Sequence, residues 1–327
     1  MAGFRKAKAE QAALKLGFYG PPGSGKSLTA LLCAEGLSAA SGKRIAYVDT
    51  ERGTDFYCQS VPTRNIHPNA FDFDAIYTRS VTEVSDEIRA LDPAVYGVVV
   101  IDSMTHIWEA TMAAFNGKKT AAGTIPFHAW GKIKKPYKDL MAFLISSPMH
   151  FIICGRQGVV YEDNEETGQT EAVGVKMKAE GETPYEPHIL IRMEVTRPKK
   201  TMENADHVAY VEKDRTGVLS GRSFVNPTFD SLCAPLMGLL GGQQAQMPTG
   251  DEAAAVDAER LAIIETERAE ESERQLREIK ARIDLAPTLA ELKLIGKQIT
   301  PQLKARMLPE NVAALREAYL ERESRMK

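Results

Sequence analysis

The sequence lacks the features that mark membrane, secreted and disulfide-bonded proteins. No apolar run approaches the ~18 residues that cross a bilayer, so no membrane contact is expected. The basic N-terminal stretch is not followed by an apolar core segment, so we expect no secretory signal. The four cysteines form no CxxC pair and no metal-ligand spacing. This pattern predicts reduced thiols in a cytoplasmic protein.

A general excess of positive charge is also absent. The net charge is −3 at pH 7, whereas nucleic-acid-binding domains are commonly basic overall. Any nucleic-acid partner must therefore be bound by a local patch. The 327 residues are 43% hydrophobic and 26% charged, which are ordinary values for a globular protein. This length predicts one large domain and a second, smaller part of the chain.

Composition divides the chain into three parts. Residues 1–240 mix glycine, proline and β-rich runs with helical stretches, and we expect them to form the main domain. Residues 241–250 carry no charge and predict a linker. Residues 251–327 predict a charged helical tail, with Pro287 between two helices and a capping-box spacing of Thr288 and Glu291. This tail is either a small appendage or a module for assembly or partner docking.

Alternating strands and helices in the main domain predict an α/β fold with parallel βαβ units. The later strands lack long helices between them, so we expect a more antiparallel edge there. The expected helices are 26–39, 80–91 and 132–146. The expected strands are 14–19, 44–49, 75–78, 97–102, 150–154, 189–196 and 207–212.

A complete GxxxxGK[ST] motif lies between the first strand and the first helix. This placement is the one that a phosphate-binding P-loop requires, because the helix N-terminus and the backbone N–H groups of the loop cradle phosphate oxygens. We expect ATP to be bound there, with Lys26 on the β- and γ-phosphates and Ser27 on Mg²⁺. The motif comprises Gly20, Pro21, Pro22, Gly23, Ser24, Gly25, Lys26 and Ser27.

A continuous apolar run, YGVVVID, ends at Asp102. Such a run predicts a strand that is buried on both faces of a parallel sheet. Its carboxyl end lies where open α/β sheets bind ligands, so Asp102 is a candidate Mg²⁺ partner beside the P-loop. An alternative role is to cap the helix that follows Ser103.

The residue that activates water has to come from elsewhere, because Ser103 stands where ring ATPases of the AAA+ type usually carry a glutamate. Glu51, just past the second strand, is the best candidate for the catalytic base. Asp49 and Asp55 are rivals for this role. The simpler interpretation of Glu51 is a solvent-exposed acidic residue in a loop, with no catalytic role.

This arrangement resembles the RecA-like ATPases, and VVVIDS looks like their Walker B strand. The resemblance implies a RecA-like P-loop core over about 14–240. It also implies a polar sensor at the end of strand 150–154, for which Gln157 is the closest match and Arg156 an alternative. The segment VEKDRTG resembles a strand end in hexameric relatives whose cations reach a neighbouring subunit's γ-phosphate. Lys213 and Arg215 hold those positions, unless they form an ordinary charged turn.

Phage-encoded RecA-like ATPases of single-strand annealing and recombination, also described as phage AAA ATPases, are similar in size and tail. This resemblance implies an ATPase that converts ATP to ADP and phosphate, is stimulated by single-stranded DNA and assembles as a homo-oligomer, either a ring or a filament. It further implies a single-strand-binding protein or another replication protein as a partner of the tail. The location would be the cytoplasm of a bacterial host.

Aromatic residues are interspersed among lysines in the segment 116–138. Phosphates can pair with lysine and bases can stack on aromatic rings, so this segment is a candidate contact for single-stranded DNA. An amphipathic helix with solvated lysines is the alternative. The next candidate segment, 158–181, is acidic and predicts a β-hairpin with its turn at 164–168. Acidic side chains there argue against tight phosphate contact.

Three functions are compatible with these patterns. The first is a DNA-dependent ATPase of recombination, annealing or replication. The second is a nucleotide-switched loader or mediator that docks a helicase or a single-strand-binding protein without itself acting on DNA. The third, a small-molecule kinase, ranks low because no arginine-rich lid segment is present.

Overall fold

The computed structural model describes residues 6, 13–62, 67–114, 129–163, 169–196, 205–240 and 250–326. The chain divides into two compact units, Met1–Met247 and Pro248–Lys327, here named the core unit and the tail unit. Each unit has a hydrophobic core of its own. The predicted linker, 241–250, lies outside the described residues except for Gly250, which begins a helix.

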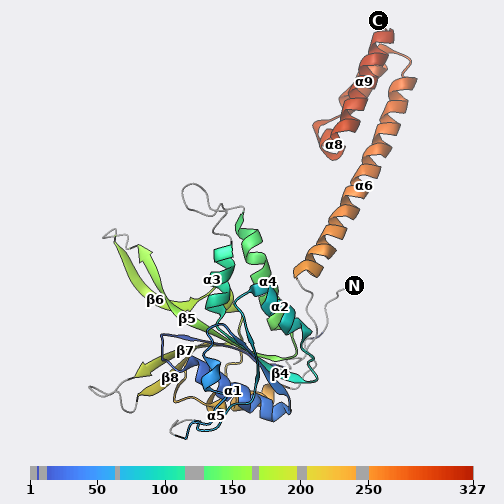
Figure 1. Cartoon of the computed structure of the whole chain (residues 1–327). Coiled ribbons are helices and arrows are strands. Elements are labelled where there is room, and N and C mark those ends of the chain that lie inside the picture. Colours follow the sequence, from blue (N-terminus) through green and yellow to red (C-terminus); the bar gives the residue numbers. More distant parts are fainter. Residues whose placement is uncertain are drawn as a thin grey trace. The chain divides into compact units, whose positions relative to one another are not determined.

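One mostly parallel sheet organises the core unit (Figure 1). Within the described residues the strand order is β3-β2-β4-β5-β1-β7-β8-β9, and β6 pairs with β5 outside this path. Pairing is parallel from β3 through β7 and antiparallel in β5–β6, β7–β8 and β8–β9, so the predicted antiparallel edge is confirmed. The strands are β1 (Lys15–Gly20), β2 (Arg44–Asp49), β3 (Asp74–Tyr77), β4 (Tyr96–Asp102), β5 (His150–Asp163), β6 (Thr170–Lys178), β7 (Ile189–Thr196), β8 (Asp206–Asp214) and β9 (Ser223–Val225).

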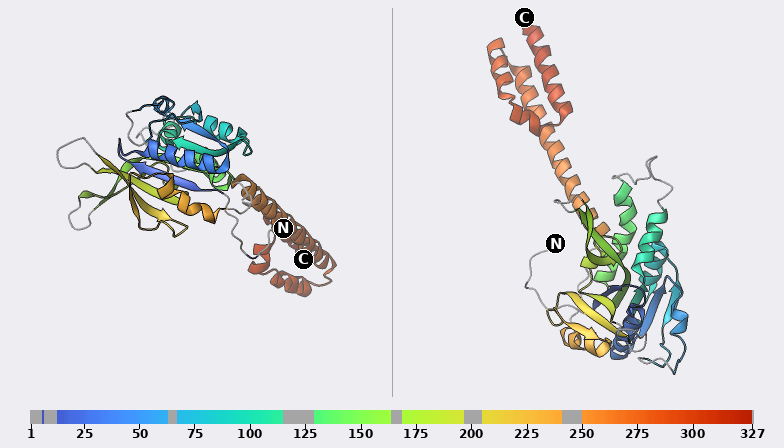
Figure 2. Two further views of the ribbon diagram at one scale, coloured as in Figure 1. Left: turned by 90° about the horizontal axis from the view of Figure 1, so that it is seen from below. Right: turned by 90° about the vertical axis from the view of Figure 1, so that its left-hand side faces the viewer.

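Helices lie on both faces of this sheet (Figure 2), and an apolar layer packs beneath them on each face. Val98 and Val100 of β4 pack with α1 and α5, whereas Val99 and Ile101 pack with α2, α3 and α4, because successive side chains of a strand point to opposite faces. Burial on both faces explains why the run is apolar at every position. The helices are α1 (Lys26–Ser41), α2 (Val81–Ala90), α3 (Met104–Ala114), α4 (Trp130–Ser146) and α5 (Phe229–Leu232), with short 3-10 helices at Thr54–Phe56, Thr183–Tyr185 and Ala234–Leu239.

The strand order decides which loops meet. β5 lies between β1, which leads into the GxxxxGK[ST] motif, and β4, which ends at Asp102, and β2 lies next to β4. Because β1, β5, β4 and β2 are parallel, their carboxyl ends share one edge of the sheet. The predicted α/β architecture, a mostly parallel sheet flanked by helices plus a helical C-terminal tail, is confirmed.

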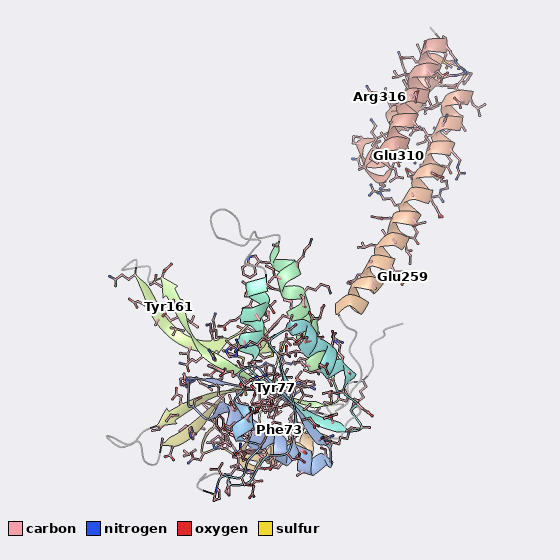
Figure 3. All side chains as sticks on the ribbon, in the orientation of Figure 1. Phe73, Tyr77, Tyr161, Glu259, Glu310 and Arg316 are labelled. Atoms are coloured by element: carbon pink, nitrogen blue, oxygen red, sulfur yellow. The ribbon has the colours of Figure 1, made fainter. Side chains whose placement is uncertain are left out.

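The acidic segment forms the predicted β-hairpin. β5 continues beyond its pairing with β1 and β4 and pairs antiparallel with β6, while the expected turn at 164–168 lies outside the described residues. Tyr161 on this hairpin is 63% exposed (Figure 3). The hairpin therefore presents an aromatic ring as well as carboxylates to solvent.

The described residues of the tail unit form four helices: α6 (Gly250–Leu285), α7 (Leu289–Gln298), α8 (Pro301–Arg306) and α9 (Pro309–Met326). Thr288 caps α7 by accepting a hydrogen bond from the Glu291 N–H, as its sequence position predicts, and Thr300 caps α8 by accepting one from the Leu303 N–H. In the part of the chain that the structure describes, no helix is long and apolar enough to cross a membrane.

Candidate active site

The P-loop occupies the turn between β1 and α1. Gly23 and Gly25 have φ angles of 72° and 88°, in the left-handed region that favours glycine. At Gly20 a Cβ atom would lie 2.2 Å from the Met193 carbonyl oxygen, so a side chain does not fit there. The loop thus needs its glycines to bring backbone N–H groups and the α1 N-terminus to one concave surface.

Lys26 points back over this loop. Its ammonium donates to the carbonyl oxygens of Gly20 at 3.0 Å and Pro21 at 2.9 Å. Burial lowers the pKa of Lys26, although Asp102 and Glu51 act in the opposite direction. A phosphate placed in the loop would supply the negative charge that this partly buried ammonium favours.

Ser27 and Asp102 meet at the end of β4. The Ser27 hydroxyl donates to Asp102 Oδ2, and the Tyr47 hydroxyl donates to the same oxygen at 3.0 Å. Burial raises the pKa of Asp102, while these two hydrogen bonds lower it, and the net shift is upward. An adjacent hydroxyl and carboxylate are hard oxygen donors of the kind that Mg²⁺ prefers, so these residues fit the expected metal.

Glu51 lies at the same edge of the sheet, just after β2. Its Oε1 atom is 3.0 Å from Arg156 Nη2 and 3.4 Å from His106 Nδ1. Arg156 comes from β5, where it is the register partner of Gly20, the last residue of β1. The Glu51 side chain remains 45% exposed, so water reaches its carboxylate. The structure therefore brings Lys26, Ser27, Asp102 and Glu51 to one edge.

The rival acids have other partners. Both carboxylate oxygens of Asp49 are occupied, since they accept hydrogen bonds from the N–H groups of Glu51, Arg52 and Thr54 and from the Thr54 hydroxyl. Burial raises the pKa of Asp49, but these hydrogen bonds outweigh it and the pKa is lowered. Asp55 accepts from the Tyr77 hydroxyl at 2.9 Å. Asp49 thus shapes the loop that carries Glu51.

The sequence did not predict that His106 and Thr50 form a buried polar contact next to Glu51. His106 Nδ1 lies 2.8 Å from Thr50 Oγ1, and burial lowers the pKa of His106. Thr50 also accepts from the Ser103 N–H, which ties the end of β2 to the start of α3. A lone histidine four residues after Asp102 in a helical run gives no sequence signal for this contact.

Arg156 and Gln157, the two candidates for the polar sensor, point to opposite faces of β5. Arg156 contacts Glu51, whereas Gln157 is paired with Met177 in the β5–β6 hairpin. Alternation along a strand places neighbouring side chains on opposite faces. Of the two, the structure therefore brings Arg156 to the P-loop edge.

Lys213 and Arg215 lie near the amino ends of the parallel strands, whereas their own P-loop lies at the carboxyl ends. β8 runs antiparallel to β7, and Asp214 is the partner of Ile189 at the start of β7. Lys213 donates to the carbonyl oxygens of Tyr185 and Pro187, and Arg215 donates to that of Tyr185 at 2.8 Å. Burial, with a contribution from Arg215, lowers the pKa of Lys213 to about 8.

His207 is a further neighbour of the P-loop that the sequence did not indicate. A Cβ atom on Gly25 would lie 3.0 Å from His207 Nδ1. This nitrogen is buried and has no hydrogen-bond partner among the described residues. His207 is the second residue of β8, so only the antiparallel pairing with β7 brings it here.

The candidate DNA segment is only partly described, because 115–128 lies outside the described residues. In α4, Lys134 forms an ion pair with Glu180 at 2.7 Å and Lys135 with Asp139 at 3.0 Å. Tyr137 is buried in the apolar layer and hydrogen-bonded to Thr183, so it is not available to stack on a base. The aromatic part of the predicted pattern is thus partly core.

Comparison with known proteins gives one family. Residues 12–216 match a family model described as an AAA domain. None of the curated proteins matches the chain. Among solved structures, it is similar to a KaiC-like protein from Pyrococcus horikoshii OT3 (13% identity, TM-score 0.40, covering 65% of this chain and 84% of that chain). It is also similar to the flagellar accessory protein FlaH from Methanocaldococcus jannaschii (14%, 0.36, 63% and 81%).

Proposed function

This chain belongs to the AAA domain family of P-loop ATPases, and we propose that it hydrolyses ATP to ADP and phosphate with Mg²⁺ while acting on single-stranded DNA. The observation that carries the ATPase part is the convergence of four side chains at one sheet edge. Lys26 and Ser27 come from the P-loop, Asp102 from the end of β4 and Glu51 from the end of β2. In this proposal the four side chains supply a phosphate site, a metal partner and an acid with access to water.

The binding step is assigned to the P-loop and its neighbours. Residues 20–27 would hold the phosphates through backbone N–H groups, and the Lys26 ammonium would exchange its loop carbonyls for phosphate oxygens. Ser27 and Asp102 would hold Mg²⁺. When bound, that ion neutralises charge on the phosphates during transfer.

The hydrolytic step is assigned to Glu51. Its carboxylate would orient a water and accept a proton at an Oε atom. Arg156 and His106 hold this carboxylate in place, and Asp49 fixes the backbone on either side of it. We propose Arg156, in place of Gln157, as the residue at this strand end that senses the state of the site.

The DNA partner and the assembly of subunits are further parts of the proposal. Single-stranded DNA would bind lysines of α4 together with Tyr161 of the β5–β6 hairpin, which is exposed although its strand is acidic. Lys213 and Arg215 would act on a neighbouring subunit in a ring or filament, since they lie far from their own P-loop. The setting would be recombination, annealing or replication of phage type in the bacterial cytoplasm, and the tail would bind a single-strand-binding protein.

The second candidate is a nucleotide-switched loader or mediator that does not itself contact DNA. The acidic side chains of the hairpin and the ion pairs of Lys134 and Lys135 favour it, because they leave fewer free cations for phosphates. The dependence of ATP turnover on single-stranded DNA separates the two functions. Stimulation of the purified chain supports the first, and turnover that responds only to a protein partner supports the second.

Lys26→Ala tests the ATPase itself. The β- and γ-phosphates lose their cation, so we expect turnover to fall at least ~10³-fold and nucleotide binding to weaken. Lys43→Ala is the matched control, because Lys43 lies in the same unit but donates to the Pro93 carbonyl on the surface. Turnover at the wild-type level in Lys26→Ala would remove the P-loop assignment.

A further inference from the structure

The first part of helix α6 carries an exposed apolar pair. Leu261 and Ile264 are 61% and 53% exposed, although the second part of the same helix is packed against the rest of the tail through Leu276, Ile279 and Ile283. Figure 3 labels Glu259 in this first part, where no other helix of the tail unit lies beside it. Residues three apart on a helix share a face, so the two side chains form one short stripe.

A charged residue follows the apolar pair along the helix face in each direction, and the two charges have opposite signs. If Leu261 and Ile264 are taken as positions a and d of a heptad, Asp257 is the preceding d and Arg268 the following a. Arg260 and Glu267 occupy the flanking g positions. All four side chains are exposed. We refer to Asp257, Arg260, Leu261, Ile264, Glu267 and Arg268 as the α6 stripe.

We propose that the α6 stripe binds the same stripe of a second copy of this chain, with the two helices antiparallel. In this register Leu261 packs on Ile264 of the second copy, and Ile264 packs on its Leu261. Asp257 then faces Arg268 of the second copy. On the flank, Arg260 faces its Glu267. Each contact occurs twice because the pair is two-fold symmetric.

The charges of Asp257 and Arg268 favour this orientation over the parallel one. A parallel pair in register would set Asp257 against Asp257 and Arg268 against Arg268, and like charges across a helix pair are unfavourable. Antiparallel pairing turns every one of these contacts into a contact between opposite charges. A stripe complementary to itself in one orientation points to a second copy as its occupant.

One existing contact of the stripe is compatible with the pairing. Arg268 donates to the Ala305 carbonyl at 3.4 Å within the tail unit. A guanidinium has five N–H donors, so it can keep this long hydrogen bond and also meet a carboxylate. Asp257, Arg260 and Glu267 have no ion-pair partner among the described residues. The pairing would therefore not require Arg268 to give up its contact with α8.

Disulfide trapping tests the register directly. In a Cys58→Ser background, which removes the exposed cysteine, Asp257→Cys and Arg268→Cys chains are prepared separately and then mixed under mild oxidation. Antiparallel pairing places these two positions opposite each other. It separates two copies of position 257 by about 11 residues, or ~16 Å along the helix, beyond the reach of a disulfide. We expect a crosslinked dimer on mixing and none from either chain alone.

The other outcomes overturn the proposal. A dimer from each chain alone, with none gained on mixing, indicates parallel pairing. No crosslink in any sample indicates that the stripes do not meet. Because both substitutions lie on the surface, circular dichroism of the two chains verifies that helix content is retained.

A second measurement uses neighbouring isoleucines as a matched pair. Ile263 is 52% exposed, almost the same as Ile264, but it lies on a different face of the helix. For the full chain without nucleotide, sedimentation should show that Ile264→Glu raises the dimer dissociation constant at least ~100-fold. Ile263→Glu should change it less than ~3-fold. Equal effects, or a wild-type chain that stays monomeric at ~100 μM, would overturn the proposal.

Charge exchange completes the test. Arg260→Glu sets glutamate against Glu267 of the second copy on both sides, so we expect the dissociation constant to rise about tenfold. Adding Glu267→Arg restores opposite charges in the exchanged order, and affinity should return to within ~3-fold of wild type. A double variant that binds no better than Arg260→Glu contradicts the g-position contact.

Discussion

The core unit and the tail unit place their polar groups in opposite ways. In the core unit, Asp49, Ser103 and His106 are buried, and they lie together with Asp102 at the carboxyl edge of the sheet. In the tail unit the charges are on the surface, and the buried polar pair Ser272 and Asn311 is hydrogen-bonded to itself. Among the tail residues that the structure describes, seven buried apolar side chains form the core: Ile283, Ala286, Leu292, Ile295, Met307, Leu315 and Ala318.

This difference separates a unit arranged for chemistry from a unit arranged for packing. Buried titratable groups cost free energy unless other groups compensate them, and the large two-sided core around the sheet supplies that stability. The tail has no such reserve, because small helical units are only marginally stable. We therefore expect substitutions in the core unit to affect chemistry first and substitutions in the tail unit to affect folding first.

Glu51→Gln is the strongest test on the core side. Glutamine keeps the size and polarity of the side chain but cannot accept a proton, so single-turnover hydrolysis should fall at least ~10²-fold while ATP binding stays nearly unchanged. Asp49→Asn is the matched variant. Because Asp49 accepts hydrogen bonds on both oxygens, we expect it to lower stability by about 1–3 kcal/mol. If Asp49→Asn alone reduces the chemical step, the base has been assigned to the wrong acid.

Leu315→Ala is the corresponding test on the tail side. Leu315 is buried, and a leucine-to-alanine change in a core costs about 2–5 kcal/mol, which approaches the whole stability of such a unit. Helical circular dichroism should show early loss of the tail, while ATP binding by the core unit stays within ~2-fold of wild type. Leu320→Ala on the same helix is the control, because Leu320 is 53% exposed. Loss of ATP binding in Leu315→Ala would show that the units are not independent.

The same contrast explains what the sequence predicted. In the tail, helix starts at Thr288 and Thr300 are local signals, read from residues within one turn of each other. In the core unit the P-loop and the strand ending at Asp102 are local patterns too. They placed Lys26, Ser27 and Asp102 correctly at one edge.

Contacts between distant segments were not predictable in this way. Arg156 reaches Glu51 across 105 positions, and His207 reaches Gly25 only because β8 runs antiparallel to β7. The sequence ranked Gln157 above Arg156 because it could not show which strand face meets the P-loop. Strand order and register settle such questions, and they depend on the whole sheet.

Acid should destabilise the core unit and leave the tail unit comparatively unaffected. All six histidines precede the tail, and burial lowers the pKa of both His150 and His188 to about 4. His150 Nδ1 accepts a hydrogen bond from the Leu14 N–H, which requires the neutral ring. The folded pKa lies below the unfolded value of 6.5, so this stability is present above pH 6.5 and is lost as pH falls toward 4.

For His150 alone the loss between pH 7 and pH 5 is about 2 kcal/mol. Denaturant unfolding followed by tryptophan fluorescence isolates the core unit, because Trp108 and Trp130 are the two tryptophans of the chain. His150→Gln keeps an acceptor that does not titrate in this range and should flatten the pH dependence. An equally steep dependence in that variant would show that His150 is not its source.

The smallest effect concerns helix caps, and it compares the two units on equal terms. Thr288 caps α7 in the tail through the Glu291 N–H at 3.3 Å, and Ser80 caps α2 in the core unit through the Glu83 N–H at the same distance. Removing either hydroxyl by substitution with alanine leaves one N–H unsatisfied and should cost about 1 kcal/mol.

In the tail this is a large share of the total stability, so the midpoint of tail unfolding should shift clearly in Thr288→Ala. In Ser80→Ala the fluorescence-detected midpoint should shift less, because the same cost is set against a larger core. Thr288→Ser, which retains the acceptor, should behave as wild type, and a shift equal to that of Thr288→Ala would mean that the methyl group, not the cap, stabilises α7.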